Sequence, residues 1–226
     1  IWGDNGASAE GQNGTISELL AQNGIPTTIQ QHIKALDELG GLDVLGSPKT
    51  DNMYHAGWAW AGSAPYKGTK LVAAHFGGTR NPMAIRWPAR IKPDANFRAQ
   101  FLHVIDVVPT LYDIIGIKLP MVVNGFKQDP MDGVSSAGTF KDANAKEVRH
   151  TQYFEVMGSR GIYHDGWFAG AIGPRLPWVP GLPKGFINEK GQLIWDADND
   201  VWELYNLNED WTQANDLTAK NPKKLA

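Results

Sequence analysis

Two short stretches, far apart in the sequence, carry residue types that can bind charged groups. The first runs from Pro65 to Pro82 and gathers three cations, Lys67, Lys70 and Arg80, with His75 shortly before a Gly-Gly pair. A lysine that precedes a buried strand can be aimed into a cleft at the edge of a sheet, where an anionic group of a substrate would bind. Most lysines are solvated surface charges, so this stretch alone leaves that interpretation open.

The second stretch, Gly3-Asp4-Asn5-Gly6, has the composition of half a metal site. Two apolar residues precede it, which favours the end of a strand followed by a loop, where open α/β sheets bind ligands. Asp4 and Asn5 offer carboxylate and amide oxygens, the ligands that hard cations such as Ca²⁺ and Mg²⁺ take. Ca²⁺ requires about six to eight oxygens, so substrate, water or protein outside this chain would supply the rest. An ordinary Asp-Asn-Gly turn is the alternative.

Composition narrows the class of protein. The chain has 226 residues, of which 42% are hydrophobic and 20% charged, as in ordinary globular proteins. Its formal net charge of −3 gives no electrostatic footprint for nucleic acid, and no apolar run is long enough to predict a membrane span. The absence of cysteine excludes disulfides, thiolate metal sites and a cysteine nucleophile within this chain. Nine tryptophans and 25 glycines fit a loop-rich enzyme.

Both ends of the sequence have the pattern of an interrupted element. The chain opens on Ile1-Trp2 without an initiator methionine. At the other end, Asn221-Pro222 predicts a helix start a few residues before the last residue. We therefore expect a piece of a longer protein.

The first part of the chain alternates helix and strand patterns. A capping-box pattern at Thr28 and apolar residues at helical spacing predict a short helix that ends before a Gly-Gly pair. Residues 46–64 are rich in Gly, Ala and Trp without periodicity, which predicts a long ordered loop. The run 83–87 predicts a buried strand, and residues 106–115 predict a helix with Asp106 as its N-cap. This alternation indicates an α/β layer with a mainly parallel sheet over residues 1–147.

From residue 148 onward the pattern changes to short antiparallel strands. His164-Asp165-Gly166 has the composition of a hairpin turn. Proline-rich residues 174–185 predict a loop, and residues 141–149 a solvated boundary. The strands are expected at 153–157, 162–163, 167–169 and 201–205. We expect a small α+β subdomain over 148–226, made of an antiparallel sheet and a helix.

The motifs form an ordered set that resembles the C-terminal half of the sulfatase family, in its bacterial arylsulfatase branch. The set covers nearly the whole chain, and the order of its members is more specific than any one of them. Its members are Gly3-Asp4-Asn5-Gly6, Pro65-Tyr66-Lys67-Gly68-Thr69-Lys70, Gly77-Gly78-Thr79-Arg80-Asn81-Pro82, Trp202-Glu203-Leu204-Tyr205-Asn206-Leu207, Ala214-Asn215-Asp216-Leu217 and Asn221-Pro222.

The resemblance implies an alkaline-phosphatase-like α/β sandwich, partial here because its N-terminal half is missing, that hydrolyses sulfate esters. In this family a formylglycine hydrate attacks sulfur and a divalent cation, usually Ca²⁺, binds the sulfate oxygens. Asp4 and Asn5 match the late pair of metal ligands, and Lys70 matches the catalytic lysine that contacts the sulfate. His75 is a further candidate for substrate binding. Arg80 is expected to be a structural ion-pair residue beside the site.

The departures from the family pattern leave alternatives open. The Cys/Ser-x-Pro-x-Arg signature that yields formylglycine is absent, and Phe76 stands where much of the family has glutamate. We therefore expect this chain alone to be inactive, with a small-molecule sulfate ester and the missing N-terminal portion of the same protein as its partners. A phosphate or phosphonate monoester hydrolase of the same superfamily is one alternative. A non-catalytic domain that binds a ligand through its tryptophan-rich loops is another.

Overall fold

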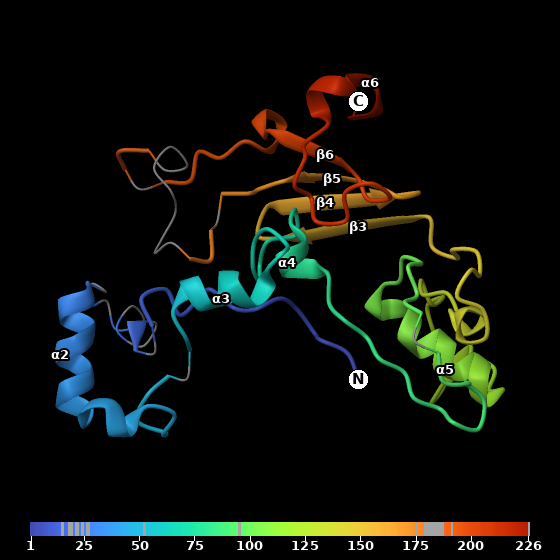
Figure 1. Cartoon of the computed structure of the whole chain (residues 1–226), viewed down its shortest axis with the longest axis horizontal. Coiled ribbons are helices and arrows are strands. Elements are labelled where there is room, and N and C mark those ends of the chain that lie inside the picture. Colours follow the sequence, from blue (N-terminus) through green and yellow to red (C-terminus); the bar gives the residue numbers. More distant parts are fainter. Residues whose placement is uncertain are drawn as a thin grey trace. The chain divides into compact units, whose positions relative to one another are not determined.

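The computed structural model describes the chain except for residues 15, 18–19, 21–22, 24, 26–27, 52, 95, 175, 179–187, 191 and 226. The chain divides into two compact units, a first unit of residues 1–83 with 153–226 and a second unit of residues 84–152. The elements are labelled in Figure 1. None of the described helices is long and apolar enough to cross a bilayer. The domain boundary expected between residues 147 and 148 stays a prediction.

A four-stranded sheet dominates the first unit, with its strands in the order β3-β4-β5-β6 (Figure 1). Antiparallel pairing joins β4 to β5 and β5 to β6. Asp165 and Gly166 have φ angles of 43° and 80°, as the predicted two-residue turn requires. The small antiparallel sheet is therefore confirmed. Its strands are β3 (Thr151–Val156), β4 (Ser159–His164), β5 (Trp167–Ala171) and β6 (Trp202–Asn206).

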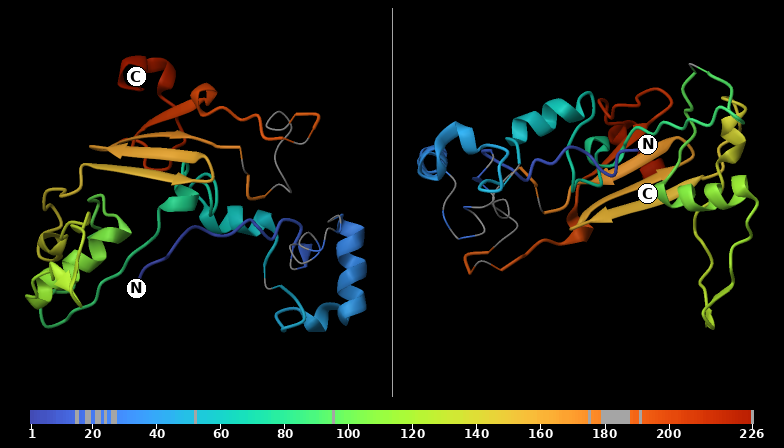
Figure 2. Two further views of the ribbon diagram at one scale, coloured as in Figure 1. Left: turned by 180° about the vertical axis from the view of Figure 1, so that it is seen from behind. Right: turned by 90° about the horizontal axis from the view of Figure 1, so that it is seen from below.

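One face of this sheet is covered by the segment that carries the cations. Phe76 lies in the short helix α4 (Phe76–Thr79), and its ring packs edge-on against Phe168 of β5 at 4.9 Å between centroids. The backbone approaches so closely that a Cβ on Gly170 would lie 2.8 Å from the carbonyl oxygen of Ala74. Both views in Figure 2 show α4 against the sheet. The sheet thus fixes the conformation of the cationic segment.

The helices whose bounds are described before this segment are α2 (Ile29–Leu39), the 3₁₀ turn η1 (Gly41–Val44) and α3 (Ala56–Ser63). The predicted capping box of α2 is confirmed, with Thr28 as N-cap and Gly40 as C-cap. The long loop predicted over 46–64 was wrong, because α3 lies within it. Its small residues give no amphipathic pattern, and the helix is held instead by close packing of Ala59 against Ala9.

The buried strand predicted over 83–87 was also wrong. Met83 forms only an isolated antiparallel bridge with Trp2, and the apolar side chain of Ile85 is 47% exposed. Within the described part of residues 1–147, the strands are limited to the antiparallel hairpin of β1 (Val122–Val123) and β2 (Phe126–Lys127). The parallel sheet expected for this range is therefore absent from the described residues, and the run 83–87 has no neighbouring strand to pair with.

The second unit contains the predicted helix as α5 (Val107–Ile115), which ends at Gly116 in the left-handed conformation. A 3₁₀ turn, η2 (Val104–Asp106), precedes it, and η3 (Ala137–Phe140) follows the hairpin. Asp106 does not cap the helix with its side chain as predicted; it is 2% exposed and accepts from Arg149 Nε at 2.9 Å. Arg149 is thus a half-buried ion-pair residue at the end of the predicted solvated boundary 141–149, in which five of the nine residues are exposed and none is buried.

The remaining elements of the first unit are short. They are η4 (Ala197–Asn199), η5 (Thr218–Lys220) and α6 (Pro222–Leu225), the last beginning where Asn221-Pro222 predicts a helix. Most of the proline-rich loop predicted over 174–185 lies outside the described residues. The chain is thus a mixed α/β structure with a small antiparallel sheet and a short helix near its end.

Candidate functional site

The opening loop and the cationic segment, more than 60 residues apart in sequence, are held together by their backbones. A Cβ on Gly6 would lie 1.7 Å from the carbonyl oxygen of Gly77, so only glycine permits this approach. The hydrogen bonds that join the two segments are Gly3 N to Pro82 O at 3.1 Å, Gly6 N to Gly78 O at 3.1 Å and Lys70 N to Ala7 O at 3.0 Å. Both predicted stretches therefore form one local structure.

Asp4 and Asn5 lie in this loop, directly after the bridge residue Trp2 and its neighbour Gly3. Both side chains are exposed, and Asn5 Nδ2 donates to Asp4 Oδ2 at 3.1 Å. Because the amide nitrogen faces Asp4, the Asn5 Oδ1 oxygen and the second Asp4 oxygen remain available as acceptors. The pair offers two hard oxygen ligands on an open surface, which is a partial set for Ca²⁺ or Mg²⁺.

The backbone of Lys70 is bonded directly to this loop, because its amide donates to Ala7 O at 3.0 Å. Its ammonium lies 2.8 Å from Glu10 Oε2, and its side chain is 35% exposed. Thr69 just before it is fully buried, and Leu71 just after it has a φ angle of 73°. The sequence analysis missed Glu10, whose partner is 60 residues away.

The second lysine of the segment, Lys67, enters a different network that includes residues of β6. Lys67 Nζ donates to the Tyr205 hydroxyl at 2.6 Å and lies 3.3 Å from Glu203 Oε2. The Tyr205 hydroxyl donates to the same carboxylate oxygen at 2.6 Å, and His75 Nε2 lies 3.0 Å from it. Lys67, Tyr205 and His75 thus all contact the Oε2 oxygen of Glu203 in β6. The sequence contained a signal for the contact between Glu203 and Tyr205. The two residues are two positions apart in a predicted strand, so their side chains point to the same face of the sheet.

This network shifts two pKa values. The hydrogen bond from His75, together with those from Tyr205 and the charge of Lys67, lowers the pKa of Glu203 from 4.5 to about 2, against the opposing effect of burial. Burial, and then the neighbouring Glu203 carboxylate, raises the pKa of Tyr205 well above its ordinary value. Glu203 is therefore ionised and Tyr205 neutral at physiological pH.

His75 lies inside this network rather than at the surface. The residue is 5% exposed, and its Nδ1 atom is buried without a hydrogen-bond partner in the described part of the chain. Its observed contact ties the cationic segment to Glu203 of β6. A contact between His75 and substrate stays a prediction.

Two further residues fix the segment from the sheet side. Gln213 is fully buried, where its side chain accepts from Phe76 N at 2.7 Å and donates to Ala74 O at 3.1 Å. Arg80 lies over three aromatic rings, those of Tyr66, Phe76 and Trp211, at 5.6 to 5.9 Å. The ion pair expected for Arg80 is not found among the described residues, because the rings and the Trp211 carbonyl occupy its guanidinium instead.

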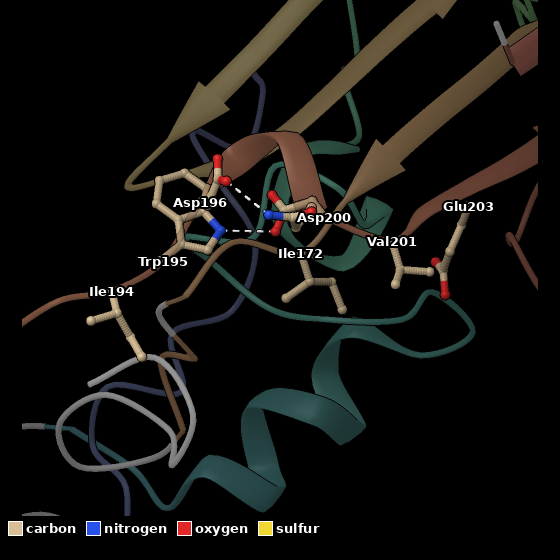
Figure 3. Close-up of a pocket in the computed structure, with 8 residues that line it drawn as sticks. Ile172, Ile194, Trp195, Asp196, Asp200, Val201 and Glu203 are labelled. Carbon is tan, nitrogen blue, oxygen red and sulfur yellow. Dashed lines mark hydrogen bonds between the residues drawn. The ribbon is translucent and has the colours of Figure 1, made fainter. Parts of the chain in front are cut away.

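A pocket of about 460 Å³ opens beside β6 and is shown in Figure 3. The Trp195 indole donates to Asp200 Oδ1 at 2.8 Å, and Asp200 also pairs with Arg160 at 2.6 Å. The wall is rich in carboxylates, which disfavours a sulfate group here. Its lining residues are Ile172, Ile194, Trp195, Asp196, Asn199, Asp200, Val201 and Glu203. The opening loop with Lys70 is the better candidate for an anion.

No family model matches the sequence. The curated proteins similar to it include two sulfatases. One is a sulfatase of Formosa agariphila, 29% identical over 155 residues, which cover 66% of this chain and 24% of that protein. The other is an uncharacterized sulfatase of Schizosaccharomyces pombe, 28% identical over 190 residues, or 81% of this chain and 29% of that protein. The chain thus spans about a quarter of the length of these relatives.

Partial likenesses also exist among solved structures. One is a protein from work on glycosaminoglycan metabolism by Bacteroides thetaiotaomicron, with a TM-score of 0.48 and 22% identity over 77% of this chain and 34% of that one. Another was solved with its substrate D-glucosamine-2-N,6-O-disulfate, with a TM-score of 0.39 and 17% identity over 87% of this chain and 35% of that one. The two sequence relatives, together with the ordered motifs, support a likeness of this chain to the C-terminal portion of sulfatases.

Proposed function

We propose that the protein carrying this chain hydrolyses sulfate esters, with an arylsulfatase-like preference, and that this chain supplies Lys70, Asp4 and Asn5 to the site. The observation that carries the proposal is the backbone pairing of the opening loop with the cationic segment, which brings a lysine and two hard oxygen ligands into one local structure. The similarity to two sulfatases supports the reaction class. The nucleophile, a formylglycine in this family, would come from protein outside this chain.

Lys70 would act as a donor to the sulfate group and to the oxygen that leaves. Its ammonium has three N–H donors. Glu10 contacts this ammonium from one side. Charge that develops on the leaving oxygen is stabilised by a donor held in place before the reaction, an effect worth roughly 3–4 kcal/mol per well-placed donor. The side chain of Lys70 is partly exposed, which leaves its ammonium accessible to a ligand. Lys67 is exposed to the same extent, but the Tyr205 hydroxyl and the Glu203 carboxylate both engage its ammonium.

Asp4 and Asn5 would hold the divalent cation. Their exposed oxygens are the type of ligand that a hard cation binds. Two residues cannot supply the six or more ligands that such a cation needs. Bound there, Ca²⁺ or Mg²⁺ would neutralise charge on the sulfate oxygens. The task of this chain is to orient the Asp4 carboxylate, which it does through the Asn5 amide and the hydrogen bonds of Gly3 and Gly6.

A second candidate function is a non-catalytic module that binds a ligand through aromatic side chains. The specific observation in its favour is Trp58 of α3, whose side chain is 72% exposed, with Trp60 two residues later packed edge-on against Trp178 at 5.0 Å. Exposed aromatic rings are common at binding surfaces. Substitution of Trp58 by Ala would abolish ligand binding under this function and leave sulfate ester hydrolysis unchanged under the first.

The discriminating experiment compares hydrolysis of 4-nitrophenyl sulfate and 4-nitrophenyl phosphate by the natural protein that carries this sequence. We expect turnover of the sulfate ester and little turnover of the phosphate ester. Faster hydrolysis of the phosphate ester would favour the phosphate or phosphonate monoester hydrolase instead. The 226-residue chain alone is expected to be inactive, because it lacks a nucleophile, and loss of a nucleophile leaves only a residual rate.

A further inference from the structure

The ammonium of Lys70 is held by a carboxylate that belongs to the same loop as Asp4 and Asn5. Glu10 Oε2 lies 2.8 Å from Lys70 Nζ, and the Glu10 side chain is only 21% exposed. Ser8 fixes this carboxylate, because its hydroxyl donates to Glu10 Oε2 at 3.0 Å and accepts from the Glu10 backbone at 3.3 Å. The Glu10 carboxylate is therefore held in position for its ion pair with Lys70.

The backbone around Lys70 is also constrained. Its amide donates to Ala7 O at 3.0 Å, one residue before Ser8. Leu71 adopts a φ angle of 73°, a left-handed conformation that is unfavourable for a non-glycine residue and persists only where the surroundings impose it. Such strain concentrates at functional sites. The fold thus accepts an unfavourable conformation directly after Lys70.

Lys67 provides an internal comparison, since each lysine has its own carboxylate. Lys67 pairs with Glu203 at 3.3 Å and is also bound by the Tyr205 hydroxyl, within a network that joins the segment to the sheet. Lys70 pairs with Glu10 in the opening loop. The two ion pairs therefore tie the same segment to two different places: that of Lys67 ties it to β6, and that of Lys70 ties it to the loop that follows Asp4 and Asn5 in the sequence.

We propose that Glu10 is a positioning residue, which holds the Lys70 ammonium toward the opening loop so that its remaining N–H donors face an incoming sulfate ester. The proposal rests on the function proposed above for Lys70. Its consequence is a division of roles: Glu10 carries a negative charge that opposes binding of an anion, and at the same time it fixes the donor that stabilises the reaction. Loss of the carboxylate should therefore affect anion binding and turnover in opposite directions.

The first experiment needs neither sulfate nor activity. The natural protein that carries this sequence is trace-labelled with acetic anhydride, and acetylation of each lysine is resolved by fragment ions in mass spectrometry. Glu10→Gln should raise labelling of Lys70 by about two- to fivefold, the change expected on losing a partly exposed ion pair, and leave Lys67 unchanged. Glu203→Gln is the matched control and should raise labelling of Lys67 without affecting Lys70. Equal labelling of Lys70 in the original chain and in Glu10→Gln would overturn the assignment of Glu10.

Ser8→Ala keeps the test decisive if Glu10→Gln does not fold. It removes one hydrogen bond from the Glu10 carboxylate and should raise labelling of Lys70 in the same direction by a smaller factor. Unchanged labelling of Lys70 in Ser8→Ala, in the absence of a folded Glu10→Gln, would overturn the assignment.

The second experiment measures turnover in the natural protein that carries this sequence, with 4-nitrophenyl sulfate as substrate. Glu10→Gln should lower kcat by about tenfold, a part of the effect of one lost donor, while KM stays equal or falls because a negative charge has been removed. Glu10→Asp should restore part of kcat. A rise in KM with unchanged kcat would refute the positioning role. Absence of turnover in the unsubstituted protein would instead refute the proposed function, while the labelling result for Glu10 would stand or fall by itself.

Discussion

Replacement of Glu203 by glutamine tests whether the network on β6 stabilises the fold. The carboxylate accepts from His75, Tyr205 and Lys67, and these partners lower its pKa from 4.5 to about 2. A lowering of that size corresponds to roughly 3 kcal/mol of stability at neutral pH if it is fully realised. Because the Glu203 side chain is 31% exposed, solvent screens part of this interaction. We therefore expect Glu203→Gln to reduce the free energy of unfolding by roughly 2 kcal/mol.

The effect of Glu203→Gln has a defined pH dependence. A carboxylate whose pKa is lower in the folded state contributes stability above its unfolded pKa, here 4.5, and loses it as the pH falls through about 2. The difference between the original chain and Glu203→Gln should thus be constant from pH 7 to pH 5.5 and fall by about half near pH 3.

Urea unfolding followed by tryptophan fluorescence and circular dichroism measures this difference at each pH. Glu209→Gln is the matched control, since Glu209 is exposed and lies three residues beyond the end of β6. The control should change the free energy of unfolding by less than about 0.5 kcal/mol. A loss from Glu203→Gln that is equally small at pH 7, or that stays the same down to pH 3, would show that the carboxylate does not stabilise the fold as an ion.

Three other outcomes are expected. Tyr205→Phe removes a hydroxyl that bonds two partners and should lower the free energy of unfolding by roughly 1–3 kcal/mol in the same urea assay, and no change would contradict the role of that hydroxyl. Gly77→Ala places a Cβ 2.1 Å from a backbone carbonyl oxygen and should cost about 2 kcal/mol or more, whereas Gly138→Ala meets no atom within 4 Å and should be nearly neutral; equal melting temperatures for the two variants would refute the close approach. In the natural protein that carries this sequence, Asp4→Asn should weaken Ca²⁺ binding by about tenfold or more in calorimetry, and Asp37→Asn on α2 should not; equal isotherms would remove Asp4 from the metal site.

The parts of the fold that could be predicted are those whose signal is local. The β4–β5 hairpin follows from an Asp-Gly turn between β-forming runs, and α2 follows from the capping box at Thr28. The helix α3 was missed because Ala and Gly carry no amphipathic pattern, so its sequence has the composition of a loop. The prediction of a strand at 83–87 was wrong because an apolar run forms a strand only when another strand lies beside it. Among the described residues, Met83 has only an isolated bridge with Trp2.

The residues of the candidate site also divide into those with a local sequence signal and those without one. Asp4, Asn5 and Lys70 were proposed because their motifs resemble those of a known family, and their roles stay predictions. Backbone hydrogen bonds join the two segments that carry them. Their partners were not identifiable, because Glu10 and Glu203 lie 60 and 136 residues from the lysines they bind. Sequence spacing gives no information on pairings over such distances, which depend on the packing of the cationic segment against the sheet.

The most direct test of the central proposal is the rate of sulfate ester hydrolysis after Lys70→Ala in the natural protein that carries this sequence. Lys220→Ala serves as the control, because Lys220 is exposed in η5 and lies outside the cationic segment. With 4-nitrophenyl sulfate at saturation, Lys70→Ala should lower kcat by roughly 10²–10³, and Lys220→Ala should leave it unchanged. An equal kcat in the original protein and in Lys70→Ala would contradict the role of Lys70 in the reaction and return it to the class of surface lysines.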